Sequence, residues 1–94
     1  MSKINKEWAS SNRLIKIDLQ DNRQMLKEAK TAFANDMKEL KAELAKNPQD
    51  WDCELIHNMA LCAKDRANEI KACEYSIERL KEKQAVNLWK KYDD

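Results

Sequence analysis

Apolar and small side chains recur every three or four residues along the first half of the chain. These steps alternate around the 3.6-residue helical repeat, so the stripe stays on one face of a helix. Its members are Ile4, Trp8, Ser11, Ile15, Leu19, Asn22, Leu26, Ala29, Phe33, Met37, Leu40 and Leu44. The stripe predicts a helix over about residues 3–46. Ser10, Ser11 and Asn12 favour caps over helix interiors, which leaves open a break at 10–12 after a short extra N-terminal helix.

A second stripe with the same spacing predicts another helix over about residues 48–91. Its members are Leu55, Met59, Cys62, Arg66, Ile70, Cys73, Ile77, Leu80, Gln84 and Leu88. Between the stripes, Asn47 is a common N-cap residue and Pro48 fits the first helical position. A turn at 46–48 between two long helices predicts an antiparallel helical hairpin with a coiled-coil-like seam.

A hairpin centred near Asn47 and Pro48 also predicts which residues face each other. Facing residues have numbers that add to nearly the same total, so Arg66 is expected opposite Glu28, and we predict a salt bridge there. Asn22 and Gln84 interrupt the stripes, as isolated polar residues do when they fix the register of a helical seam.

The composition supports an all-α fold in a single domain, 1–94. The 94 residues include no glycine and one proline, and 37% of them are charged. Tight β-hairpins usually need Asn-Gly, Asp-Gly or Gly-Gly, so hairpin-connected strands are not expected. The lack of glycine also excludes the glycine-rich loops by which many folds bind phosphate groups.

Candidate chemistry is sparse. Cys53 and His57 are one helical turn apart, but structural zinc needs four ligands, and no second histidine or Cys-x-x-Cys pair supplies them. The pair also has no third group to orient it for nucleophilic catalysis, and carboxylates are mixed with lysines on solvated faces. We therefore expect no enzymatic activity, no metal and no cofactor.

The first residues, the lengths of the apolar stretches and the cysteines together predict the cellular compartment. The first residues contain no apolar run that could serve as a signal peptide, and no stretch approaches the length of a membrane span. Three cysteines within one predicted helix cannot all pair within the chain, and reduced thiols fit the cytosol. The sequence predicts a cytoplasmic protein that does not enter the membrane.

Apolar residues outside both stripes gather near the end of the hairpin that is distant from the turn. Two long helices cannot enclose a core alone, and a patch of this size is typical of an interaction surface. Two compatible interpretations explain the patch. In one, the segment before Ser10 folds back over it; in the other, a second chain docks there in a helical bundle, with a homodimer as the favoured oligomer. The candidate partner-binding residues are Trp8, Leu14, Ile17, Val86, Trp89 and Tyr92.

Basic residues lie near the same end and support an alternative. The candidate nucleic-acid-binding residues are Arg13, Lys16, Arg23, Lys83, Lys90 and Lys91. Acidic residues are mixed among them, and the net charge of the chain is only +1, so the attraction for a polyanion is weak.

The resulting ranking places a small protein-binding module first. It would act as an inhibitor, an adaptor or a sequestering protein through a helical surface, as accessory proteins encoded by phages or mobile elements do. A nucleic-acid-binding helical-bundle regulator is the alternative, and a structural or assembly coiled coil is the second alternative.

Overall fold

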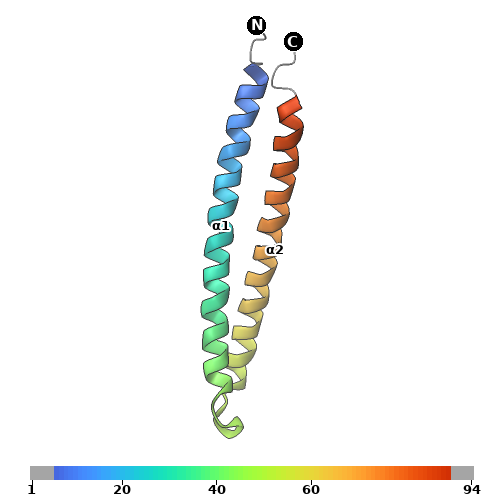
Figure 1. Ribbon diagram of the computed structural model, residues 1–94. Helices are drawn as coiled ribbons and strands as arrows, with labels where there is room; N and C mark the ends of the chain where they lie inside the picture. Colours follow the sequence, from blue (N-terminus) through green and yellow to red (C-terminus); the bar gives the residue numbers. More distant parts are fainter. Residues whose placement is uncertain (1–5, 90–94) are drawn as a thin grey trace. The chain divides into compact units, whose positions relative to one another are not determined.

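A computed structural model describes residues 6–89 of the chain, and the side chains of residues 9–88. It contains two long helices, α1 (Lys6–Leu44) and α2 (Cys53–Trp89), with a short 3-10 helix, η1 (Pro48–Asp50), between them (Figure 1). The described residues form no β-strand. The predicted fold class, an all-α helical hairpin, is confirmed.

Helix α1 continues through 10–12 without a break. Serine and asparagine cost at most about 0.7 kcal/mol each in a helix interior, a penalty that the packing of the neighbouring turns can outweigh. Ile15 and Leu19, which follow this segment, are buried. The break that the sequence left open is therefore absent, and Ile4 lies outside the described residues.

The connection between the helices differs from the predicted turn at 46–48. Asn47 adopts an extended conformation (φ −55°, ψ 138°), as expected for a residue before proline. Pro48 then starts η1, in which the N–H of Asp50 donates to the carbonyl oxygen of Asn47 at 2.8 Å. Trp51 is extended again (φ −67°, ψ 132°), so the helical path ends there. The helical path expected from about residue 48 thus starts as η1, is interrupted at Trp51, and resumes as α2 at Cys53.

Helix α2 begins at Cys53 because Asp52 caps it. Oδ1 of Asp52 accepts a hydrogen bond from the backbone N–H of Leu55 at 3.0 Å, and its carbonyl oxygen accepts one from Ile56 at 3.0 Å. This is the geometry of a helix N-cap. Asn47, the cap that the sequence suggested, makes no capping hydrogen bond with its side chain.

Asp52→Ala is expected to lower the free energy of unfolding by about 1 kcal/mol, because the N–H of Leu55 loses its acceptor. Asn47→Ala is the matched control and should change it by no more than a few tenths of a kcal/mol, since no cap is lost. Urea denaturation followed by far-UV circular dichroism measures both variants. Equal losses would contradict the assignment of Asp52 as the cap.

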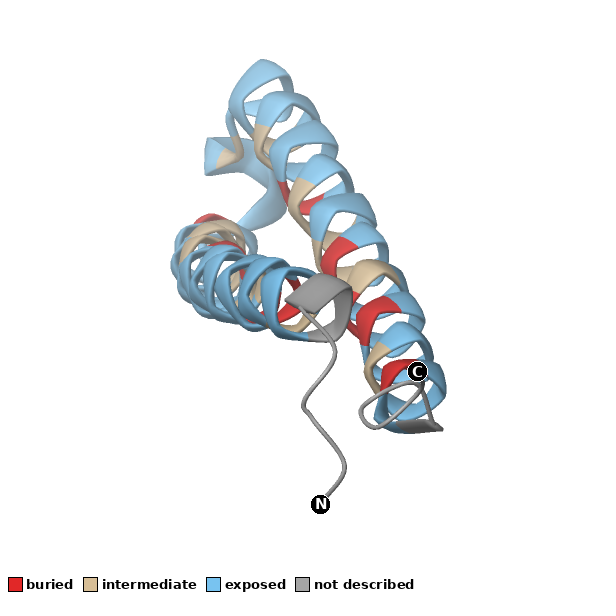
Figure 2. Cartoon of the chain, turned by 90° about the horizontal axis from the view of Figure 1, so that it is seen from above, coloured by how far each residue is buried: buried red, intermediate tan, exposed pale blue. Residues whose placement is uncertain are grey.

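The chain divides into two compact units, each of which contains part of both helices. Unit 1 comprises Met1–Met25 and Cys73–Asp94, and unit 2 comprises Leu26–Ala72. In Figure 2 the buried positions, in red, follow one side of each helix. The buried apolar residues of unit 1 are Ile15, Leu19, Cys73, Ile77 and Leu80, and those of unit 2 are Ala29 and Ala63.

The salt bridge of Arg66 shows that the predicted register is wrong. In unit 2, Nε of Arg66 lies 3.9 Å from Oδ2 of Asp36, and its Nη1 lies 3.3 Å from Oε1 of Glu69. The expected pairing with Glu28 does not form. Residues 45–52 form the connection, although the prediction assigned most of them to helix, so α2 starts later and Arg66 meets a residue closer to the turn.

Among the stripe positions whose side chains the structure describes, most are buried or half-buried as predicted, but five are exposed. The exposed ones are Ser11, Leu44, Leu55, Cys62 and Leu88, and in each case an adjacent residue is less exposed: Asn12, Glu43, Ile56, Ala63 and Asn87 respectively. At these places the apolar pattern predicts the wrong one of two adjacent residues to be buried, because the contact between helices also accommodates small or polar side chains. Glu43 is buried with partners for its carboxylate oxygens, and Asn87 also has an interaction partner.

Candidate protein-binding surface

Unit 1 exposes more large apolar side chains than unit 2 among the described residues. Unit 1 exposes Leu14, Ile17, Met25, Tyr75, Val86 and Leu88, whereas unit 2 exposes Leu44, Leu55 and Leu61. Single exposed apolar residues are ordinary, but a cluster of them at a protein surface is typical of an interaction site. Unit 1 is therefore the candidate.

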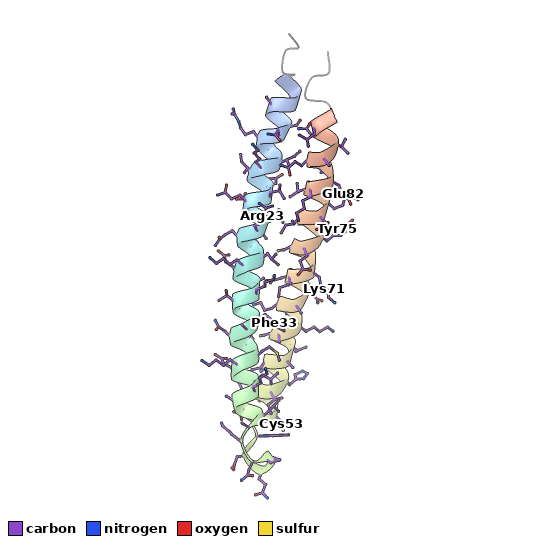
Figure 3. The ribbon with its side chains drawn as sticks, viewed as in Figure 1. Arg23, Phe33, Cys53, Lys71, Tyr75 and Glu82 are labelled. Carbon is purple, nitrogen blue, oxygen red and sulfur yellow. The ribbon has the colours of Figure 1, made fainter. Side chains whose placement is uncertain are left out.

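Helical spacing divides these residues into sides of α1 and α2. Leu14 and Met25 are four residues before and seven residues after Asp18, so all three share one side of α1. Tyr75 and Val86 are eleven residues apart, or about three helical turns, and share one side of α2. Figure 3 labels Tyr75 on α2.

Two adjoining hollows lie between these sides of unit 1. One, of about 380 Å³, is lined by Ile15, Arg79, Glu82, Lys83, Val86 and Asn87. The other, of about 330 Å³, is lined by Asp18, Asn22, Tyr75, Ser76, Arg79, Leu80 and Lys83. Because Arg79 and Lys83 line both hollows, the two form one surface feature, which we call the unit 1 groove.

In the hollow of about 330 Å³ the two helices contribute opposite charges, while α2 also adds the acidic Glu82 to the hollow of about 380 Å³. From α2 come Arg79 and Lys83, and the guanidinium carbon of Arg79 lies 5.9 Å from the centroid of the Tyr75 ring. This cation–π contact places Arg79 beside Tyr75. From α1 comes Asp18, whose backbone carbonyl oxygen accepts a hydrogen bond from Nδ2 of Asn22 at 2.8 Å. Among the described residues the carboxylate of Asp18 has no ion pair within 4.0 Å.

A further hollow of about 340 Å³ lies on α1. Its lining residues are Ala9, Asn12, Arg13, Lys16, Ile17 and Gln20. All of them belong to one helix, so this is a shallow surface in which Ile17 is flanked by two basic side chains. It shares no residue with the unit 1 groove.

Three of the predicted partner-binding residues have side chains in the described part of the chain. Leu14, Ile17 and Val86 are all exposed on unit 1. Val86 lines the unit 1 groove, whereas Ile17 lies in the hollow on α1. The side chains of Trp8 and Trp89, and all of Tyr92, lie outside the described residues, as does the segment proposed to fold back over this end.

Four of the predicted nucleic-acid-binding residues have side chains in the described part of the chain. Arg13 and Lys16 line the hollow on α1, Lys83 lines the unit 1 groove, and Arg23 is an exposed residue of α1 (Figure 3). Lys90 and Lys91 lie outside the described residues. Residues 9–25 and 73–88 together carry six basic and five acidic residues, a balance that gives little attraction for a polyanion.

Groups suited to metal or thiol chemistry are separate from this surface. Cys53 and His57 are both exposed near the start of α2, in unit 2. Cys53, Cys62 and Cys73 are free thiols, and Cys73 is buried. The described residues contain no group of three or more potential metal ligands. None of the helices described is both long enough and apolar enough to cross a membrane.

The sequence did not predict the unit 1 groove, because that prediction needed the correct register. Asp18 and Arg79 were not among the candidate residues, although both line the groove. Two local signals were available: the spacing of Leu14, Asp18 and Met25, and the aromatic–cationic pair formed by Tyr75 and Arg79 four residues apart. Neither signal alone shows that this side of α1 lies next to this side of α2.

Comparison of the chain with protein families, with curated proteins and with solved structures finds no match in any of the three. The candidate surface therefore depends on the geometry and chemistry of unit 1 alone.

Proposed function

We propose that this chain is a small non-enzymatic protein-binding module that acts as an inhibitor, an adaptor or a sequestering protein in the cytoplasm. The binding surface is the exposed apolar surface of unit 1. One observation carries the proposal: six large apolar side chains of unit 1 are exposed among the described residues, against three in unit 2. Burial of such side chains against a partner is favourable at roughly 25 cal/mol per Å² of apolar surface.

The arrangement of charge in unit 1 also favours a protein partner. Basic and acidic residues are nearly equal in number in 9–25 and 73–88, so the surface resembles the mixed polar rim of a protein interface. Ile17 lines the hollow on α1 together with the basic residues Arg13 and Lys16. An apolar residue with basic neighbours fits a partner that presents an apolar contact with acidic groups around it.

Ile17→Asp is expected to weaken partner binding by about tenfold or more, because it places a charge where an apolar side chain would be buried. The tagged chain would first capture its partner from a nuclease-treated lysate of the native host, with identification by mass spectrometry. Affinities of the wild type and the variant for the purified partner are then compared by calorimetry.

Leu61→Asp is the matched control, because Leu61 in unit 2 is as exposed as Ile17, at 48% against 47%. It should leave partner binding unchanged. Failure to capture any protein, or equal losses in the two variants, would refute the proposed surface. Binding to RNA or DNA that weakens steeply with salt would support the nucleic-acid alternative instead.

A further inference from the structure

We propose that the unit 1 groove is the docking site for a second copy of this chain, with Asp18 of each copy facing Arg79 and Lys83 of the other. This inference deepens the proposed function, on which it rests, by naming one partner of the same unit. The hollow on α1 that contains Ile17 shares no residue with the groove and stays available to a different protein.

The thin core of the described helices is the first argument for a second copy. Among the described residues no large side chain is fully buried, so the helices have a thin core that a second pair of helices would thicken.

Charge complementarity is the second argument, and it selects one arrangement of the two copies. Asp18, Arg79 and Lys83 line the same hollow, so they lie at the same level of unit 1. A twofold axis parallel to the helices lays α1 of one copy over α2 of the other and keeps this level. It therefore brings each Asp18 to the Arg79 and Lys83 of the other copy. An axis that crosses the helices at the level of Asp18 would lay α1 on α1 and place the two Asp18 carboxylates together, which is unfavourable.

The apolar residues fit the same arrangement. Leu14 and Met25 lie on the side of α1 that carries Asp18. Tyr75 and Val86 line the groove from α2. When α1 of one copy lies over α2 of the other, the apolar side of α1 contacts the apolar side of α2. The twofold symmetry makes this contact twice in the dimer. Apolar contacts at the centre and charged contacts beside them are typical of stable symmetric interfaces.

The first experiment compares Val86→Asp with Leu88→Asp by analytical ultracentrifugation. The wild type is expected to be a dimer. Val86 lines the groove, so Val86→Asp should raise the dimer dissociation constant at least about 30-fold. Leu88 is equally exposed, at 61% against 57%, but lines neither hollow of the groove, so Leu88→Asp should remain dimeric. Circular dichroism establishes that both variants keep their helices.

The second experiment swaps charges between the two walls of the groove. Asp18→Arg alone, or Arg79→Asp with Lys83→Asp, places like charges together and should raise the dimer dissociation constant at least about 100-fold. An equimolar mixture of these two variants restores both opposite-charge contacts, so it should form a heterodimer. Mixing changes only the contacts between copies, because the contacts within each variant chain are the same before and after mixing. Recovery of a dimer in the mixture therefore reports contacts between copies. Glu74→Arg, an exposed α2 residue outside the groove, changes the charge equally and should leave the dimer intact.

A wild type that is monomeric at its highest soluble concentration would overturn the inference, as would a mixture that stays monomeric. Dimers that form equally well with Val86→Asp would place the interface on another face and also overturn it. A monomeric wild type that captures a different protein through Val86 would assign the groove to that protein. The two failures are distinguishable. A monomeric wild type whose partner capture is still lost in Ile17→Asp would contradict this inference alone, whereas a dimeric wild type in which Ile17→Asp leaves partner capture unchanged would contradict the proposed function alone.

Discussion

Leu19→Ala is expected to lower the free energy of unfolding by about 2–5 kcal/mol, which is the range for truncating a buried leucine. Leu19 is 4% exposed, the lowest value among the buried apolar residues of the described chain. Domains of this size are stable by only about 5–15 kcal/mol, so the substitution removes a large fraction of the total. Urea denaturation followed by far-UV circular dichroism, at one fixed protein concentration, measures the loss.

Leu88→Ala is the control for this prediction, because the same type of side chain is removed from an exposed position of the same unit. Its effect on the free energy of unfolding should lie within about 0.5 kcal/mol of zero. If the two variants lost equal stability, the assignment of Leu19 to the core and of Leu88 to the surface would be wrong.

The second large effect is expected at Glu43, which links the end of α1 to the start of α2. Its Oε1 accepts a hydrogen bond from the backbone N–H of Asp52 at 3.0 Å, and its Oε2 lies 2.8 Å from Nζ of Lys46. Nε1 of Trp51 donates to the carbonyl oxygen of Lys46 at 2.8 Å, which fastens the same segment. Glu43→Ala removes both contacts of the carboxylate and should shift the urea midpoint clearly downward, since the N–H of Asp52 loses the acceptor of a part-buried hydrogen bond.

The same contacts make stability depend on pH. The hydrogen bond from Lys46, followed by that from the N–H of Asp52, lowers the pKa of Glu43 below its ordinary value of 4.5. Its contribution to stability is therefore present above that value and is lost as the pH falls through the lowered pKa of the folded state. The hydrogen bond with Glu43 raises the pKa of Lys46 above 10.5, so that contribution is present below 10.5 and is lost as the pH rises through the raised pKa.

Glu43→Gln tests this dependence, because the amide oxygen can still accept from Asp52 while the charge is lost. The urea midpoint of the variant should fall less on acidification than that of the wild type, and less at strongly alkaline pH. Glu39→Gln, at an exposed position of α1, removes a charge outside the connection and serves as the control. Identical pH profiles for the wild type and Glu43→Gln would show that the ionised carboxylate of Glu43 does not stabilise the fold.

The two helices could be predicted from sequence because their signal repeats over many turns. Ile15, Leu19, Ile77 and Leu80 follow the helical period and are buried as expected. The connection could not be predicted in the same way, because a cap needs only one residue and several nearby residues are suitable. Asp52 caps α2 in place of Asn47.

Because the cap of α2 was predicted at the wrong residue, the predicted register between α1 and α2 was also wrong. The later start of α2 pairs Arg66 with Asp36, so the expected contact with Glu28 was wrong. For the candidate surface, the exposure of Leu14, Ile17 and Val86 followed from their places outside the stripes. Their division between the unit 1 groove and the hollow on α1 did not, because it depends on which sides of the two helices adjoin.

The bond between Glu43 and Asp52 also bears on the order in which the chain folds. It joins residues nine positions apart, whereas Ile15 and Val86, which line one hollow of unit 1, are separated by 71 positions. Closing a loop costs entropy that grows with its length, by about 0.6 kcal/mol for each doubling. We therefore expect the helices to pair first beside the connection and then progressively toward the chain ends. The connection then acts as the folding nucleus, and the surface of unit 1 becomes competent to bind only in the last steps.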